Sequence, residues 1–486
     1  MCAAWTPPLP NECPVPMHDG EPCRRPIHRG PTGIDKAPVC LMHSRDLHKD
    51  PEEFTKEIQA IISSSSKYKH AANDHDFTRF VFLEVDFRKA SFFGNAYFLE
   101  STFTQRADFS EVKFFGHTGF WKATFAEDAD FWGASFGSPP QSPEAAQNMP
   151  LKVADFQETT FGGDANFAGA IFGQRADFSQ AVFGPRLGQL AGSDASQKHA
   201  AIADFRAVRF DKPENVRFYR VNKDSSQGLL LRLVDCEIEG VHFQDVNWHR
   251  QRGRMVLQDE LDITAGHNKG LNSGAETVSE VRHELVAIAY RRMISNFERV
   301  RAYDVAEDCF VGAMEMRRRD PRYSYLARQK QVLKFYLRHT GATWLIQQFS
   351  LTNLYRVLSN YGSSYKRALA WLLAFLLLFA VVFPCFGLRM RDLRHSRGEV
   401  AETAASSTLT DTFSWQAAWR HPARGRELLR TAEAGFWTAV EVATFAKSPT
   451  MEPASNSGRK LAVAEVIVIP GQLALFFLAL RRRFRR

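Results

Sequence analysis

Residues 107–136 read ADFSEVKFFGHTGFWKATFAEDADFWGASF, and residues 154–183 read ADFQETTFGGDANFAGAIFGQRADFSQAVF. In both stretches a Phe returns after five and then six residues, and a small residue usually stands two positions before it. A helix needs a period of about 3.6 and a strand a period of two, so neither element explains the spacing. A chain that turns a corner about every five residues explains it.

The repeated Phe positions therefore predict the interior of a coil. Each short side sends one large and one small side chain inward, successive coils stack Phe on Phe, and the backbones of neighbouring coils pair. The residue added in every second unit enlarges a four-sided coil at a corner. The positions of this kind are Phe77, Phe82, Phe87, Phe92, Phe98, Phe103, Phe109, Phe114, Phe120, Phe125, Phe131, Phe136, Phe156, Phe161, Phe167, Phe172, Phe178 and Phe183.

These units resemble the pentapeptide-repeat family in its Phe-centred form, over residues 77–250. The resemblance implies a right-handed quadrilateral β-solenoid, from which the inserts at 138–151 and 185–200 loop out. Some members of that family mimic DNA and bind topoisomerases, which requires an acidic surface. This chain has a net charge of +8, which argues against such an acidic surface. The fold alone does not establish a function.

Composition restricts the class of protein. Of the 486 residues, 40 are Phe, 44% are hydrophobic and 24% are charged. These fractions are ordinary for a folded protein, and they exclude a largely disordered chain and a transporter with many spans. The N-terminus lacks the basic and apolar regions of a secretory signal. We therefore expect clustered cysteines to bind metal rather than to form disulfides.

Residues 1–50 form a predicted metal-binding module. Cys13 and Cys23 are separated by nine residues, and Cys40 begins a C-x-x-H pair. Three thiolates and one imidazole are typical of a closed structural zinc site, and the metal would supply folding energy to a segment with little core. His18 or His28 is an alternative ligand, and a loosely ordered tail with free thiols is the other interpretation. The predicted zinc ligands are Cys13, Cys23, Cys40 and His43.

The middle of the chain predicts a linker and a helical pair. Residues 251–276 are polar and indicate a loop, whereas residues 275–320 show two stripes of helical periodicity. The stretch YRRMISNFERVRAYDVAEDCFVGAMEMRRR resembles a helical module of bacterial membrane proteins that carry pentapeptide repeats. One antiparallel pair, like a single tetratricopeptide unit, is too short for a solenoid, so we expect it to dock onto a neighbouring element.

Two apolar runs predict membrane spans in residues 368–486. Residues 368–388 contain no charge over 21 positions, which is enough to cross a hydrocarbon core of about 30 Å. Residues 461–480 are long enough as well but contain Glu465 and Pro470. For this second run, a buried helix of a soluble protein is the alternative.

Basic residues predict the orientation of these spans. Residues 322–367, a basic interfacial segment beside the membrane, hold eight Lys and Arg and no acidic residue, and the chain ends RRRFRR. Positive residues favour the cytoplasmic side. We therefore expect a two-span protein of the cell inner membrane with both termini in the cytoplasm.

The C-terminal part is similar to the two-helix pore module of potassium-channel-like proteins. AGFWTAVEVATF would be its re-entrant pore-like helix, and a Thr followed by Gly-Tyr-Gly-Asp forms the filter in that family. Here the Thr and the next, hydrophobic position are kept. The two glycine positions hold Ala and Ser, and the aromatic position holds Lys, which would repel a cation. The corresponding residues are Thr444, Phe445, Ala446, Lys447 and Ser448.

Glu465 is a further pore-like residue, because an ionisable residue inside a span is a functional candidate by default. It can line a pore or pair with Lys447 or Arg459. It also stands only four residues into the apolar run, where it can reach the lipid headgroups.

Two hypotheses of function follow. The chain holds no nucleophile–base set, no phosphate-binding Gly loop and no carboxylate pair of catalytic spacing, so we do not expect an enzyme. One hypothesis is a solenoid tethered to a membrane domain that conducts ions under cytoplasmic control, with four subunits around the pore. The other is a non-conducting, membrane-tethered scaffold that binds a protein partner through the solenoid. The expected partners are the lipid bilayer, further copies of the chain and a protein, but not nucleic acid.

Overall fold

The computed structural model describes residues 8–28, 35, 37–62, 74–137, 152–185, 200–265, 282–320, 351–390, 412–445 and 451–484. It divides into two compact units, Met1–Ser324 and Tyr325–Arg486. Each unit has its own hydrophobic core. The inserts at 138–151 and 186–199, and the basic segment from 322 to 350, lie outside the described residues.

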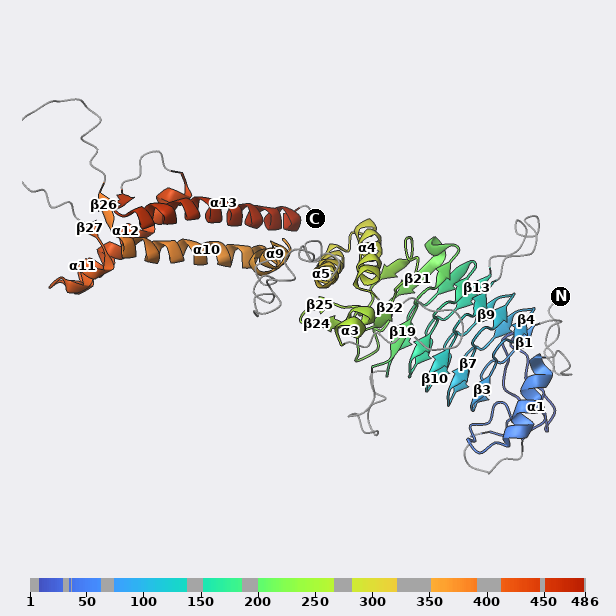
Figure 1. Cartoon of the computed structure of the whole chain (residues 1–486). Coiled ribbons are helices and arrows are strands. Elements are labelled where there is room, and N and C mark those ends of the chain that lie inside the picture. The colour runs from blue at the N-terminus through green and yellow to red at the C-terminus, as the bar shows by residue number, and fades with distance from the viewer. Residues whose placement is uncertain are drawn as a thin grey trace, which may run out of the picture. The chain divides into compact units, whose positions relative to one another are not determined.

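The first unit is built on four parallel sheets that follow one another around a stack of coils (Figure 1). The first sheet contains β1 (His75–Asp76), β5 (Ala96–Tyr97), β9 (Thr118–Gly119), β13 (Val153–Asp155), β17 (Arg175–Asp177), β21 (Val216–Tyr219) and β23 (His242–Gln244). The second contains β2 (Val81–Phe82), β6 (Thr102–Phe103), β10 (Thr124–Phe125), β14 (Thr160–Phe161) and β18 (Val182–Phe183). The third contains β3 (Val85–Asp86), β7 (Ala107–Asp108), β11 (Ala129–Asp130), β15 (Ala165–Asn166), β19 (Ile202–Asp204) and β22 (Leu230–Arg232). The fourth contains β4 (Ser91–Phe92), β8 (Lys113–Phe114), β12 (Ser135–Phe136), β16 (Ile171–Phe172) and β20 (Arg209–Phe210).

Identical residues stack inside these sheets. The ring of Phe131 lies face to face with those of Phe109 and Phe167, each 4.9 Å away between centroids. In the same sheet Ala129 pairs with Ala107 of the coil before. The stacked β-solenoid and its Phe core are confirmed, and each buried Phe contributes about 1.5–3 kcal/mol of transfer free energy.

Two kinds of corner alternate around each coil. After the first and third sheets the chain turns through a residue of positive φ, such as Lys122 at 57° and Gly133 at 63°. An Asp ahead of the turn satisfies its backbone, as where Asp130 Oδ1 accepts a hydrogen bond from the N–H of Trp132 at 3.0 Å. The six-residue steps, such as Phe103 to Phe109, fall at the other two corners. The added residue therefore lies at a corner, as the spacing predicted.

Helices and a hairpin close the last coils. They are η1 (Pro213–Asn215), β24 (Arg250–Gln251), β25 (Arg254–Met255), α3 (Gln258–Thr264), α4 (His283–Arg299) and α5 (Tyr303–Arg319). Asn296 of α4 accepts from the N–H of Gly240 at 2.9 Å and donates to the carbonyl of Ile238 at 2.6 Å. The ring of Phe297 lies 6.1 Å from that of Phe243, the last Phe of the first sheet. The helical pair docks onto a neighbour, as predicted.

The prediction of a loop over 251–276 was wrong for its first half. Residues 250–255 form the β24–β25 hairpin and residues 258–264 form α3, while 266–276 lie outside the described residues. Backbone and side-chain groups of the first half, residues 251–265, have partners inside the fold. Leu257 N–H donates to Tyr290 Oη at 2.9 Å, and Tyr290 Oη donates to Glu260 at 2.6 Å.

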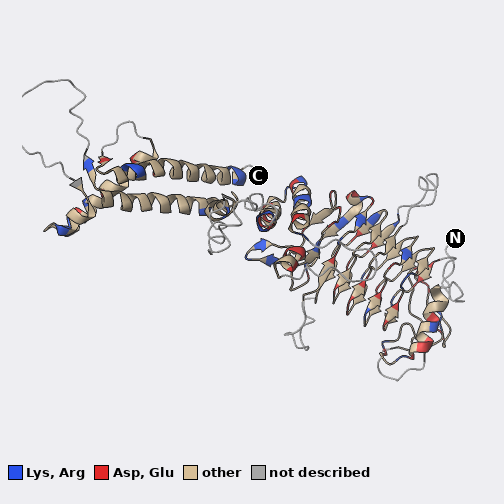
Figure 2. Ribbon diagram, viewed as in Figure 1, with Lys and Arg blue, Asp and Glu red and all other residues tan. Residues whose placement is uncertain are grey.

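The second unit contains two helices that are long and apolar enough to cross a membrane, Tyr365–Phe386 and Asn456–Phe484. Figure 2 shows both without charge over most of their length and with basic residues near their ends. The elements of the unit are α9 (Leu351–Ser359), α10 (Tyr365–Val382), η2 (Phe383–Phe386), β26 (Leu388–Met390), β27 (Thr412–Phe413), α11 (Trp415–Arg420), α12 (Arg424–Ala443), β28 (Met451–Pro453) and α13 (Asn456–Phe484). The helix predicted ahead of the second span is α12, which packs against both α10 and α13.

Candidate metal centre

The four predicted ligands come from a hairpin and a turn. Cys13 and Cys23 lie on the two arms of the hairpin, which is held by the N–H of Cys13 donating to the carbonyl of Arg25 at 2.7 Å. Cys40 begins a tight turn in which the N–H of His43 donates to the carbonyl of Cys40 at 3.1 Å. The C-x-x-H spacing thus places both side chains on one side of the turn.

The ligand atoms form a compact, buried group. His43 Nδ1 lies 3.4 Å from Cys13 Sγ and 3.2 Å from Cys40 Sγ, and Cys23 Sγ lies 3.8 Å from Cys40 Sγ. A tetrahedral zinc ion with Zn–S bonds of about 2.3 Å holds its sulfur ligands about 3.8 Å apart. A disulfide would require about 2.05 Å, and the cysteines are free. The residues therefore fit a closed S₃N metal site.

The alternative ligands lie elsewhere. The His18 ring stacks on Tyr97 with centroids 3.7 Å apart, and its Nδ1 lies 3.5 Å from Asp76 Oδ2. His28 is tied through its backbone N–H to the carbonyl of Val39 at 2.9 Å. Among the described residues, the fully buried group that can hold a metal is the one predicted, whereas His18 belongs to a second group, with Asp19 and Asp76, in which two of the three residues are exposed. Zinc as the occupant of the buried group stays a prediction.

Buried partners surround the ligands. Arg25 Nη1 lies 3.3 Å from Cys23 Sγ, while its Nε donates to Glu57 at 3.1 Å. Burial raises the pKa of the Cys40 thiol, whereas the hydrogen bond with Cys13 lowers the pKa of Cys23. Arg25 therefore stabilises negative charge on sulfur, which three thiolates around a divalent ion would carry. Sequence reasoning missed this role because Arg25 lies in a run of polar residues.

The metal module closes the first coil of the solenoid. His43 Nε2 lies 3.0 Å from the carbonyl of Thr78, and its Nδ1 faces the thiols. The N–H of Val81 in β2 donates to the carbonyl of Met42 at 2.8 Å, and Lys49 Nζ donates to the carbonyl of Val81 at 2.8 Å. Helix α1 (Pro51–Ile62) adds Phe54, whose ring lies 6.2 Å from that of Phe82. The metal module and the solenoid are therefore in direct contact.

The predicted filter is described only in part. Thr444 is the C-cap residue that follows α12, and its Oγ1 donates to the carbonyl of Val440 at 2.8 Å. Phe445 is exposed and has a φ of 54°. Residues 446–448, the predicted positions Ala446, Lys447 and Ser448, lie outside the described residues.

Glu465 lies on the buried side of α13. Its side chain is fully buried, and neither carboxylate oxygen has a hydrogen-bond partner among the described residues. Arg459 is exposed on the same helix, and the described residues show no ion pair between the two. An ion pair between Glu465 and Lys447 stays a prediction, because Lys447 lies outside the residues that the structure describes.

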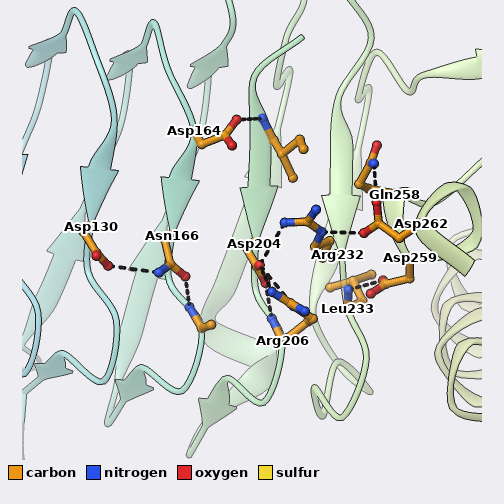
Figure 3. A network of polar contacts seen from close by, with 12 residues as sticks. Asp130, Asp164, Asn166, Asp204, Arg206, Arg232, Leu233, Gln258, Asp259 and Asp262 are labelled. Carbon is orange, nitrogen blue, oxygen red and sulfur yellow. Dashed lines mark hydrogen bonds and ion pairs between the residues drawn. The ribbon is translucent and has the colours of Figure 1, made fainter. Parts of the chain in front are cut away.

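A polar network marks the opposite end of the solenoid (Figure 3). Arg232 Nη1 donates to Asp204 at 3.3 Å and its Nε to Asp262 of α3 at 2.8 Å. Asp259 of α3 accepts from the N–H of Leu233 at 2.6 Å. Asp259 is fully buried, and burial raises its pKa to about 7. The network joins the last coils to α3, which sequence reasoning missed.

Comparison with known proteins agrees with the repeat. A family model described as pentapeptide repeats (9 copies) matches residues 151–188. No curated protein and no solved structure matches the chain. The matched stretch includes strands of all four sheets, and the same register extends on both sides of it. Pentapeptide repeats are therefore present in this chain, and they build its solenoid.

Proposed function

We propose that this protein is a membrane-anchored scaffold whose capped solenoid binds a protein partner, with a structural zinc ion in the N-terminal cap. The observation that carries the proposal is the closure of both solenoid ends by the chain itself. Open strand edges invite pairing with other chains, and capping removes them. The lateral surface of the coils is then the part left for a specific partner.

Contacts within the second unit support the membrane anchor. Arg482 at the end of α13 donates to the carbonyl of Tyr361 at 3.0 Å, just before α10 begins. Lys366 and Arg367 at the start of α10 therefore lie near the three arginines at the end of α13. Arg389, Arg459 and Lys460 flank the spans at the opposite end, so the first end is the more basic one. The positive-inside rule places that end on the cytoplasmic side of the bacterial inner membrane, so both termini would be cytoplasmic.

An exposed aromatic pair marks a candidate binding surface. Phe93 is 75% exposed, and its ring stacks on that of Phe115 in the next coil with centroids 5.2 Å apart. Exposed aromatic residues are typical of protein interfaces. Acidic side chains on the third sheet are paired with arginine, as Asp130 with Arg106 at 3.3 Å, which argues against mimicry of DNA.

Photo-crosslinking in cells tests the scaffold. A photoreactive amino acid at position 93 should give a discrete adduct with a second protein in the membrane fraction. The same amino acid at Glu84, which is exposed at a different corner, is the matched control. Absence of any adduct at 93, or an equal set of adducts at both positions, contradicts the proposed surface. Release of the chain from membranes by alkaline carbonate contradicts the anchor.

Ion conduction is the second candidate, and the packing of α12 favours it. Gly435 of α12 lies against Pro384, where an added Cβ would come 2.8 Å from its Cγ, so α12 fits closely against the first span. Helix α12 also contacts α13, as a pore helix would contact both spans. Under this hypothesis four copies enclose the pore. Flux through vesicles that changes with Lys447→Ala would support conduction, and no flux from an inserted, tetrameric sample would leave the scaffold alone.

A further inference from the structure

A single carboxylic acid is enclosed between the two long helices of the second unit. Glu465 is fully buried, and both of its oxygens lack a hydrogen-bond partner among the residues the structure describes. Two turns further on the same face, Gln472 is buried too, but its Nε2 donates to the carbonyl of Ala368 at 2.8 Å. The face thus provides an acceptor for the amide NH₂ of Gln472, but no donor among the described residues for Gln472 Oε1 or for either oxygen of Glu465.

Contacts between the helices define the depth of this acid. Gly458 lies against Phe386, where an added Cβ would come 3.4 Å from Phe386 Cβ, and Gln472 bonds to Ala368. The two helices therefore run antiparallel. Glu465 is seven residues from both Gly458 and Gln472, so it lies level with residue 377, midway between Ala368 and Phe386.

That level is the centre of the uncharged stretch 368–388. At 1.5 Å per residue, Lys366 and Arg367 begin about 15 Å away along α10. The sequence suggested that Glu465 lies close enough to the end of its run to reach the headgroups. The pairing with α10 favours the other interpretation, in which Glu465 lies inside the span and its short side chain does not extend to the headgroups.

Charged groups on the packed elements do not reach the acid. On α13 itself, Arg459 and Lys460 are exposed and lie six and five positions before Glu465, on another side of the helix. The titratable or charged side chains of the other elements that contact α13 are Tyr355 and Arg356 of α9, Tyr365, Lys366 and Arg367 of α10, Cys385 of η2, Arg424, Arg426, Glu427, Arg430, Glu433 and Glu441 of α12, and Glu452 of β28. The structure gives none of these a bond to Glu465 within its described part.

We propose that Glu465 is an intramembrane proton-binding site, held as the neutral acid at neutral pH. The inference rests on the proposed membrane placement of α10 and α13. An unpaired carboxylate at the centre of a span costs several kcal/mol or more, and a bound proton removes that cost. A metal cation would need several oxygen ligands, whereas α10 presents Leu372, Phe375, Leu376 and Phe379 around this level.

Proton occupancy would then control the pairing of the helices. Loss of the proton places a charge inside the apolar contact between α10 and α13. Pro470 follows five residues later and lacks the N–H that would bond to the carbonyl of Val466, so α13 has a weak point next to the acid. The site thus couples a proton to the geometry of the spans.

Labelling of the full chain in phospholipid vesicles tests this site. A membrane-permeant carbodiimide adds to protonated carboxyl groups in apolar surroundings, and mass spectrometry locates the adduct. We expect modification of Glu465 at neutral pH that is lost only at alkaline pH. Glu433, exposed on α12, is the internal control that should stay unmodified. The near-isosteric Glu465→Gln should abolish labelling while keeping the fold, and Glu465→Asp should keep it.

The outcomes separate this inference from the proposed anchor. An inserted chain whose Glu465 is unlabelled at neutral pH overturns the proton site alone. Protection from labelling by added K⁺ or Na⁺ also overturns it, in favour of a cation site. A chain that protease digestion shows not to be inserted overturns the anchor and the proton site together.

Discussion

At the scale of single residues, the stacked phenylalanines provide the core of the solenoid. Phe131 is fully buried between Phe109 and Phe167, so Phe131→Ala should lower the free energy of unfolding by about 3–5 kcal/mol. Phe93→Ala removes a ring that is 75% exposed and should change it by about 0.5 kcal/mol or less. Guanidinium denaturation followed by circular dichroism measures both. If the two variants lost similar free energy of unfolding, burial of Phe131 in the phenylalanine stack would not be what stabilises the coils.

Asp259 should make the stability of the first unit depend on pH. Burial raises its pKa from 3.8 to about 7 in the folded chain. Between these values the folded state keeps a proton that the unfolded state has released, so the free energy of unfolding falls as pH rises from about 4 to 7 and then levels off. Asp259→Asn keeps an acceptor for the N–H of Leu233 and should remove this part of the slope. Parallel pH profiles of the two proteins would contradict the assignment.

At the scale of elements, close packing explains one glycine of α12. A Cβ at Gly435 would collide with the carbonyl oxygen of Ala380 and with Pro384, whereas one at Gly471 of α13 would meet no atom within 4 Å. Gly435→Ala should therefore lower the melting temperature of the second unit in detergent. Gly471→Ala should leave it unchanged or raise it, because Ala favours a helix over Gly by about 1 kcal/mol. If both substitutions act alike, α12 does not pack on α10 in this way.

The N-terminal cap should depend on its metal. We expect about one zinc ion per chain, and Cys40→Ser should remove it, since three remaining ligands hold zinc far more weakly. Metal analysis and limited proteolysis measure the two effects. Loss of zinc should expose the segment from Cys13 to His43 to protease and lower the stability of the first coil. Ser44, next to the ligand His43 but not itself a ligand, gives the matched control Ser44→Ala, which should retain the metal.

The sequence predicted repeated local features better than single contacts. Phe spacing indicated the coil, the inward columns and the corner that holds the added residue, because every unit repeats the same geometry. Cys40 and His43 could be predicted because their spacing places both on one turn. The α3 helix was missed because its seven residues, QDELDIT, carry a polar pattern. Its burial depends on Arg232 and Leu233, which lie far away in the sequence, and the depth of Glu465 depends on α10.

At the scale of the whole molecule, the two units have separate cores. The core of the first draws its members from residues 13–316, and the core of the second from residues 379–469. Substitutions that share no contacts act independently. We therefore expect two thermal transitions in the full chain in lipid nanodiscs, with Phe131→Ala lowering one and Gly435→Ala lowering the other. Scanning calorimetry of both single variants and the double variant measures this. A shift of both transitions by either substitution would show that the units unfold together. The stability of the solenoid would then depend on the second unit.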